Sequence, residues 1–312
     1  MLRLFQHATR FTLAALAVAA LVGCSGSETG SEDSSGLAEG SFGLMSVTYD
    51  HNATDPSATD GSTTDQLLLN TRAQFVRYTA MDREHVGRLL ALPIDPVNDL
   101  PAIDRCHTYD LTLTIADDQD REEKGHVELL EAGQLRVQTD SGTVRLTPRH
   151  FATLLPFISG VVYGEAQSTE EQRLGQIKVN SAGGETVGAF NVSGAAPALP
   201  RLLGIAGSVP RPNITHARTR DLPISWQPAK DARPNDLTYI ELRYTRGKRE
   251  LALRCRPRDD GQFDIPATQL SLLSGSHTLE IVRLRRSAFS ADGLDRGELR
   301  ISVRELVGLS FN

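Results

Sequence analysis

Three groups that could act together in catalysis occur within the sequence Arg-Cys-His-Thr-Tyr-Asp, residues 105–110. Cys106, His107 and Asp110 are a thiol, an imidazole and a carboxylate, the types found in a nucleophile, its base and the group that orients the base. On a β-strand successive side chains point to opposite faces, so His107 would face away from both Cys106 and Asp110. We therefore expect the start of a strand here and no catalytic site.

Carboxylates gather in a second stretch, residues 117–126, where Asp117, Asp118 and Asp120 are oxygen ligands of the kind that Ca²⁺ prefers. A calcium-binding loop needs acids at alternate positions around a central glycine, and this stretch does not have that spacing. The stretch also lies between two strand patterns, which is typical of a solvated hairpin tip. The three aspartates are therefore calcium candidates by composition only, and the sequence predicts no metal site.

The motifs of common enzyme classes are not found in the chain. It has no Gly-x-Ser-x-Gly of the serine hydrolases, no His-Glu-x-x-His of the zinc proteases and no glycine-rich phosphate loop. No two of its eight histidines lie within five residues of each other. We therefore expect a non-catalytic protein without a cofactor.

The elements that must position any site are β-strands, because the dominant apolar period from residue 42 onward is two. Apolar side chains occupy every second position of residues 109–115, and clusters of Gly, Asp, Asn and Ser separate this run from similar ones. Such alternation at short spacing is typical of antiparallel, half-buried strands. Residues 81–92 have helical spacing after a capping Asp82, which predicts one short helix, and residues 147–157 predict a second helical turn.

A change in composition at residues 196–212 divides the strand patterns into two parts. The charge changes sign across it: residues 24–204 carry 13 Lys and Arg against 26 Asp and Glu, whereas residues 205–312 carry 18 against 13. We therefore expect a mainly β chain with two antiparallel β-sandwich domains in tandem, an acidic one at 42–204 and a basic one at 205–312. The basic residues are interleaved with acids and lack aromatic neighbours for base stacking, so we expect no nucleic-acid partner.

The second of these domains resembles a fibronectin type III or immunoglobulin-like sandwich. Over residues 209–312 it has Trp226 on an early strand, short alternating strands and Asp-Gly turns, which are features of that architecture. A hairpin is predicted within it, with its turn at residues 246–248. With the runs LEAGQLRV, VRLTP and GAFNVSGAAP before it, the chain also resembles uncharacterised bacterial envelope lipoproteins of two β-sandwich domains, a resemblance that implies no known activity.

The chain opens with the pattern of a secretory signal peptide. Arg3 and Arg10 lie in a first segment without acids, and residues 11–22 are apolar except for Thr12. This apolar run is too short for a helix that crosses about 30 Å of hydrocarbon, which needs roughly 20 residues. We therefore expect residues 1–23 to be cleaved from the mature protein.

The end of this segment, Leu-Val-Gly-Cys at residues 21–24, resembles the lipobox of bacterial lipoproteins. The resemblance implies cleavage before Cys24, a diacylglycerol on its sulfur and acylation of the new amino terminus, which together give stable membrane anchoring. Residues 24–41 are rich in Gly, Ser and acids and are expected to form a flexible tether. Ser25 stands where such proteins of the inner membrane have aspartate, so the resemblance implies the outer membrane of a Gram-negative bacterium and leaves the leaflet open.

These features together predict a membrane-anchored envelope lipoprotein whose only non-protein group is the lipid on Cys24. Without a catalytic motif, such a protein is expected to bind or position another envelope component, either a protein or a polysaccharide. The alternative is an anchored enzyme, or a calcium-dependent carbohydrate-binding protein, whose site is built from distant loops.

Two cysteines, Cys106 and Cys255, remain once Cys24 carries a lipid. The oxidising envelope allows them to form a disulfide between the two expected domains. Alternation places Cys255 on an apolar face with Leu251 and Leu253, which favours separate buried thiols. The sequence leaves both arrangements open.

Overall fold

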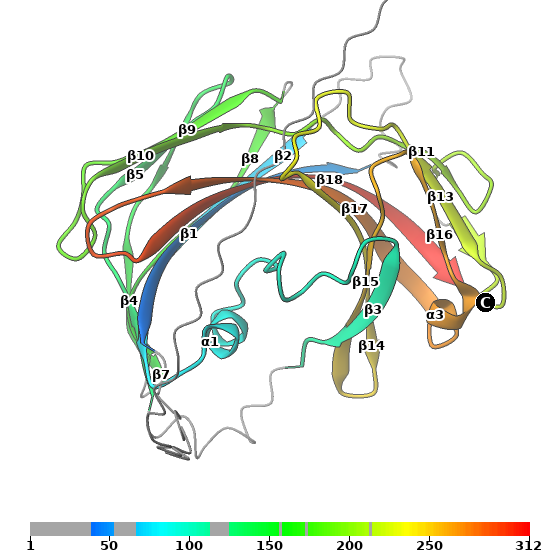
Figure 1. The fold of residues 1–312 in the computed structure, drawn as a ribbon, viewed down its shortest axis with the longest axis horizontal. Coiled ribbons are helices and arrows are strands. Elements are labelled where there is room, and N and C mark those ends of the chain that lie inside the picture. The colour runs from blue at the N-terminus through cyan, green and yellow to red at the C-terminus, as the bar shows by residue number, and fades with distance from the viewer. Residues whose placement is uncertain (1–38, 53–66, 113–124, 156–157, 172–173, 212–213) are drawn as a thin grey trace, which may run out of the picture. The chain divides into compact units, whose positions relative to one another are not determined.

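A long, curved sheet of eleven strands is the framework of the protein (Figure 1). The computed structural model describes residues 39–52, 67–112, 125–155, 158–171, 174–211 and 214–312. The strands of the large sheet are β1 (Gly40–Asn52), β2 (Leu67–Thr79), β3 (Arg105–Asp110), β4 (His126–Leu129), β7 (Arg149–Leu155), β8 (Ile158–Glu171), β12 (Ile214–His216), β14 (Leu237–Arg246), β15 (Arg249–Arg256), β17 (Gly275–Phe289) and β18 (Arg296–Phe311). Ten of them follow the order β3-β15-β14-β17-β18-β1-β2-β4-β8-β7, and β12 pairs with β18. The prediction of a mainly β chain is confirmed.

The middle of this sheet joins the two sequence domains that we expected to be separate. β1 pairs in parallel with β18, from Phe42 opposite Arg296 to Asn52 opposite Leu306. β3, also from the acidic part, pairs with β15 of the basic part. The described residues all belong to one compact unit, Leu37–Asn312. The expected boundary at residue 204 is therefore not a boundary between separate domains.

Two smaller sheets lie on the outer, convex side of the large sheet (Figure 1). One has the order β10-β9-β5-β6, from β5 (Leu135–Gln138), β6 (Thr143–Leu146), β9 (Gln176–Ser181) and β10 (Phe190–Ala195). The other has the order β11-β13-β16, from β11 (Leu202–Ile205), β13 (Leu222–Trp226) and β16 (Gln262–Ile265). Each small sheet packs on its own part of the large sheet, so the chain has two sandwich-like cores that share one layer.

Strand alternation fills both of these cores. In the first, Val47 of β1 and Ile301 of β18 belong to one buried cluster with residues of the small sheet, such as Val137 of β5 and Val179 of β9. In the second, the predicted β14–β15 hairpin contributes three register pairs that all face the core: Ile240 with Cys255, Leu242 with Leu253 and Tyr244 with Leu251. Its turn contains Gly247 at a φ of 64°, a conformation that glycine adopts without steric cost.

Two buried arginines of β17 hold the segment that connects the small sheets. Arg283 donates to the carbonyl oxygens of Ala198 and Leu199, at 3.2 and 3.1 Å, and forms a two-point ion pair with Asp259. Arg285 pairs in the same manner with Asp236 and donates to the carbonyl oxygens of residues 195 and 196. The composition change at residues 196–212 thus marks a crossing between two small sheets over a shared large sheet.

The concave side of the large sheet is crossed by residues 80–104, which we call the strap (Figure 1). It contains helix α1 (Arg83–Leu89), as predicted, and the Asp82 side chain caps it by accepting a hydrogen bond from the His85 amide at 2.7 Å. The helix packs on apolar residues of β1, β2 and β4, and Leu100 packs against β14 and β17.

The prediction of a second helical turn at residues 147–157 is wrong. Residues 149–155 form β7, whose register with β8 pairs Arg149 with Val162 and His150 with Val161. Hydrogen bonds to a neighbouring strand outweigh the local helical spacing here. The single turn α3 (Ala267–Leu270), which the sequence pattern did not predict, follows Pro266.

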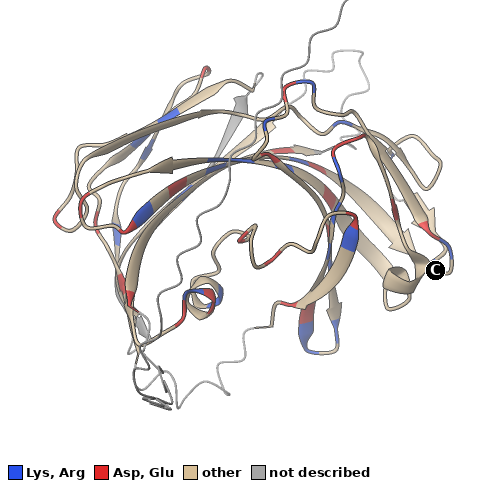
Figure 2. Ribbon diagram, viewed as in Figure 1, with Lys and Arg blue, Asp and Glu red and all other residues tan. Residues whose placement is uncertain are grey.

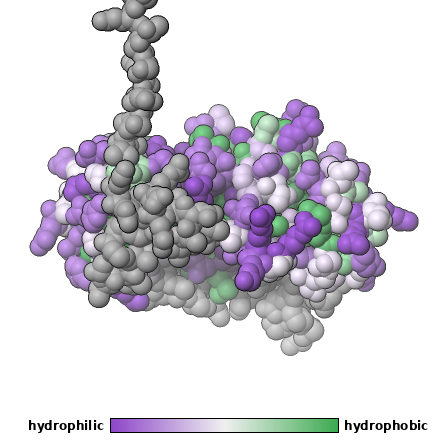
Figure 3. Space-filling view, turned by 90° about the horizontal axis from the view of Figure 1, so that it is seen from below, coloured by the Kyte–Doolittle hydropathy of each residue, from purple (hydrophilic) through white to green (hydrophobic). Residues whose placement is uncertain are grey.

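Charged residues of both signs occur along the strands of the large sheet, as Figure 2 shows. The face seen from below is largely hydrophilic where described residues are visible (Figure 3). Among the residues that the structure describes, no helix combines the length and the apolar composition needed to span a membrane.

Candidate functional site

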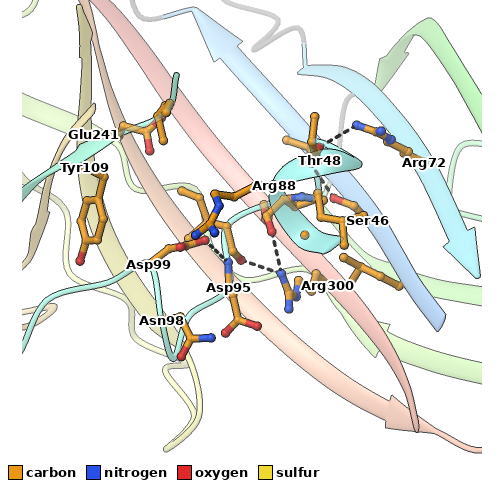
Figure 4. Close-up of a pocket in the computed structure, with 18 of the residues that line it drawn as sticks. Ser46, Thr48, Arg72, Arg88, Asp95, Asn98, Asp99, Tyr109, Glu241 and Arg300 are labelled. Carbon is orange, nitrogen blue, oxygen red and sulfur yellow. Dashed lines mark hydrogen bonds between the residues drawn. The ribbon is translucent and has the colours of Figure 1, made fainter. Parts of the chain in front are cut away.

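A cavity of about 780 Å³ lies between the concave face of the large sheet and the strap (Figure 4). Its floor takes side chains from β1, β2, β3, β14, β15, β17 and β18, and its roof takes residues of the strap between Arg83 and Asp99. Small-molecule sites in proteins are hollows of about 300–1,000 Å³. The cavity is therefore of the size that holds a small ligand.

The cavity floor is polar because the strands alternate. In β1, Met45 and Val47 are buried in the core behind the sheet, whereas Ser46 and Thr48 line the cavity. β18 repeats the pattern, with Ser302 on the cavity side. One set of strands thus supplies both the core and the site, since successive side chains point to opposite faces.

Three neutral polar side chains form a row on β18, β1 and β2, the adjacent strands at one side of the floor. Ser302 of β18 is the register partner of Thr48 of β1, and Thr48 is the register partner of Asn70 of β2. Register partners on adjacent strands share a face of the sheet. We call Ser302, Thr48 and Asn70 the neutral row.

An ion-pair cluster borders the neutral row on one side. The Arg304 guanidinium contacts both carboxylate oxygens of Asp50, at 2.6 and 2.8 Å, and reaches Glu280 at 3.1 Å. Asn70 donates from its amide to Asp50 at 2.8 Å, which ties the row to the cluster. Burial raises the pKa of Glu280 above its ordinary value, even though Arg304 opposes the shift.

A second ion-pair cluster lies on β14 and β15. Glu241, which is almost fully buried, accepts a hydrogen bond from Nε of Arg254 at 2.6 Å and another from Arg243. Burial on its own would raise the pKa of Glu241, but the two guanidiniums hold it below its ordinary value. The Arg254 guanidinium also lies 5.1 Å from the ring centre of Tyr109, within the range of a cation–π contact.

The strap is fastened over the cavity by arginines of the sheet. Arg72 of β2 donates to the carbonyl oxygens of Leu90 and Ala91, at 3.1 and 3.2 Å, just after helix α1. These carbonyls have no partner within the helix, so the guanidinium caps its C-terminal end. Arg300 of β18 donates to the carbonyl oxygens of residues 93 and 94, at 3.1 and 2.6 Å.

Four arginines of the floor already have carboxylate partners in the protein. Arg304, Arg254 and Arg243 pair with carboxylates, and Arg300 pairs with Glu298. On the roof, Arg88 of α1 pairs with Glu84 at 2.7 Å. The cavity is therefore rich in charge, and its charges are largely compensated within the protein.

The structure does not assemble the thiol, imidazole and carboxylate of residues 105–110. Cys106 forms a disulfide with Cys255, its register partner on β15, with the Cα atoms 4.0 Å apart. The His107 ring packs against Tyr109, with ring centres 4.7 Å apart, and Asp110 lies 3.7 Å from Arg249.

Two other groups of predicted residues lie outside the described part of the chain. These are the lipidation residue Cys24 and the calcium candidates Asp117, Asp118 and Asp120. Within the described residues, no three His, Cys, Asp or Glu side chains are grouped to hold a metal ion.

Sequence reasoning missed the two ion-pair clusters, although their signal is visible in the strands. Glu241 and Arg243 occupy alternate positions of β14, and Arg300 and Arg304 lie on the same face of β18, between residues that are buried in the cores. Charged residues at every second position of otherwise apolar strands lie on one face of the sheet. When several such strands pair, side chains of opposite charge can form ion pairs across that face.

The comparisons with known proteins give little for this chain. No protein-family model matches it, and no curated protein matches it. Among solved structures, a chain of two tandem Ig domains of titin is similar at 9% identity, with 67% of this chain and 90% of that chain covered and a TM-score of 0.16.

Proposed function

We propose that this protein is a non-catalytic, lipid-anchored envelope protein that binds another envelope component in the concave cavity. The observation that carries the proposal is the cavity itself: a pocket of about 780 Å³, lined by both polar and apolar side chains, whose floor is formed by paired strands from both parts of the chain. The lipobox-like residues at 21–24 support the anchoring, and by the same resemblance the outer membrane of a Gram-negative bacterium is the proposed location.

The arrangement of the charges supports binding over catalysis. A general acid or nucleophile must be free to exchange a proton or to attack, and Glu241 is instead held ionised between two arginines. Cys106, the thiol considered as a nucleophile in residues 105–110, is consumed in a disulfide and packs on the second core. A cavity whose charged side chains are already paired with one another is suited to recognising a ligand without changing it.

Crosslinking in intact cells tests the proposal. A photoreactive phenylalanine analogue replaces Asn98 or Tyr109, which both line the cavity. The control position is Val209, which is 78% exposed and lies between β11 and β12, outside the cavity lining. We expect a discrete adduct from the two cavity positions and none from Val209. Equal labelling from all three positions, or none from the cavity positions, would overturn the proposal.

A further inference from the structure

We infer that the ligand of the cavity is a saccharide without net charge, an inference that rests on the proposed function. One side of the floor is the neutral row, in which Ser302 and Thr48 supply hydroxyl groups and Asn70 an amide. Hydroxyl groups both donate and accept hydrogen bonds, and an amide side chain does the same through two atoms. A sugar ring presents hydroxyl groups of this double character, so it can exchange hydrogen bonds along the row.

The ion-pair clusters select against charged ligands. An anion that approaches Arg304 also meets the carboxylates of Asp50 and Glu280, which already compensate its charge, and it would find Arg254 already held by Glu241. Close to these carboxylates the attraction of the anion to the guanidinium is offset by repulsion between like charges. A cation that approaches the carboxylates meets the arginines that already compensate their charge.

Neutral hydroxyl groups meet no such obstacle. A carboxylate has about four lone-pair sites and a guanidinium has five N–H donors, so a pair leaves groups over for a ligand. The Arg304 pair with Asp50 and Glu280 uses three N–H···O contacts. The remaining donors and acceptors belong to the register pair Asp50–Arg304, which lies beside the pair Thr48–Ser302 of the neutral row, and this suits neighbouring hydroxyl groups of one ring.

Aromatic and aliphatic side chains complete the lining. Tyr109, which lies across the cavity from Thr48 in Figure 4, and Ile94 of the strap both line it. Ligand sites combine such surfaces with a few placed polar groups. Here they offer contact to the C–H faces of a sugar ring while the neutral row contacts its hydroxyl groups.

Calorimetry on the mature, lipidated chain in detergent tests the inference with three sets of probes. The first set is maltotriose and tri-N-acetylchitotriose, which are neutral. The second is a trisaccharide that contains uronic acid, and the third is a zwitterionic tripeptide. The test variant is Thr48→Val with Ser302→Ala, which removes two hydroxyl groups from the floor. The matched control is Ser276→Ala with Ser310→Ala, which removes a hydroxyl pair 3.1 Å apart elsewhere on β17 and β18.

We expect a neutral trisaccharide to bind, the test variant to weaken that binding by about tenfold or more, and the control to leave it unchanged. The thermal midpoint of each variant, measured in parallel, verifies that it folds. Tighter binding of the acidic trisaccharide or the tripeptide, with the same dependence on Thr48 and Ser302, overturns the ligand class and leaves the proposed function standing. Neutral trisaccharides that fail to bind, or that bind both variants equally, also overturn the inference. Failure of the proposed function shows separately, as the lack of adducts from Asn98 and Tyr109.

Discussion

Glu241 and Glu280 lie directly opposite each other on the antiparallel strands β14 and β17, and their surroundings shift their acidities in opposite directions. Glu241 is almost fully buried and Glu280 is half-buried on the concave face, where two like charges side by side are unfavourable. Glu241 has two arginines, Arg254 and Arg243, whereas Glu280 has one, Arg304, which it shares with Asp50. This unequal supply of cations explains why the pKa of Glu241 is lowered and that of Glu280 is raised.

The first prediction compares Glu241→Gln with Glu280→Gln at several pH values. The lowered pKa of Glu241 means that its stabilising contribution is present above its ordinary pKa and is lost as the pH falls through the lowered value. The raised pKa of Glu280 has the opposite effect: its contribution is present below its ordinary pKa and is lost as the pH rises through the raised value.

At pH 7 we therefore expect Glu241→Gln to lose about 3–5 kcal/mol of unfolding free energy, because Arg254 stays buried without its carboxylate. The unfolding free energy of Glu280→Gln should stay within about 1 kcal/mol of that of the unmodified protein. Relative to the unmodified protein, this variant should be more stable at pH 8 than at pH 4. Urea unfolding across this range measures both. A parallel pH trend in the two variants contradicts the assignment.

The second prediction concerns the bridge between Cys106 and Cys255, which are separated by 149 positions in the sequence. In the chain-entropy model, closing a loop of this length stabilises the folded state by about 5 kcal/mol. Replacing both cysteines by serine, or adding reductant to the unmodified protein, should lower the free energy of unfolding by about this amount, measured by urea unfolding. The unmodified chain should also migrate faster in non-reducing than in reducing electrophoresis. Detection of two free thiols in the unreduced, denatured mature protein would show that the bridge does not form.

The third prediction uses the single tryptophan of the chain as its probe. Trp226 is buried, and its indole N–H donates to Asp259 at 2.7 Å, while Asp259 also pairs with the buried Arg283. Asp259→Asn should lower the unfolding free energy by about 3–5 kcal/mol, because it leaves the guanidinium without its anion. Denaturant unfolding followed by Trp226 fluorescence measures the loss. The neighbouring Asp260→Asn, at an exposed position, is the control and should change stability by no more than about 0.5 kcal/mol.

The fourth prediction concerns the proposed lipid anchor. Cys24→Ala should abolish incorporation of labelled palmitate and release the protein from the membrane fraction, because the thiol that receives the lipid is gone. Ser25→Asp should retain the label and move the protein from the outer to the inner membrane fraction, as the resemblance to lipoproteins implies. Labelling that persists in Cys24→Ala would place the lipid elsewhere and remove the basis for the proposed location.

The sequence was most informative where structure depends on neighbours in the chain. The hairpin of β14 and β15 was predicted with the correct faces and turn, because alternation and the glycine at position 247 are local signals. Helix α1 was predicted from its cap for the same reason. The expected fold class of a mainly β chain followed from repeated alternation.

The shared sheet and the cavity could not be predicted, since both depend on pairs of strands that are distant in the sequence. Nothing in β1 or β18 alone indicates that they pair, and a parallel pair has no connecting turn to reveal it. The change of charge at residue 204 looked like a boundary between domains, whereas it coincides with a crossing between two small sheets. The charged positions of β14, β15 and β17 look exposed until the register brings Glu241 beside Arg254.

The parallel pair of β1 and β18 also sets the order in which this protein can fold. Val47 and Ile301 are partners although about 250 residues separate them, so the pair has a very high contact order and forms late. A chain that emerges from its N-terminal end first must keep β1 unpaired on that side until β18 has followed. If the protein is exported, as we propose, the part of the cavity floor that β1 and β18 form is completed only when translocation is nearly finished. Until then the exposed edge of β1 is open to non-native pairing, and we expect export to depend on factors that shield such an edge.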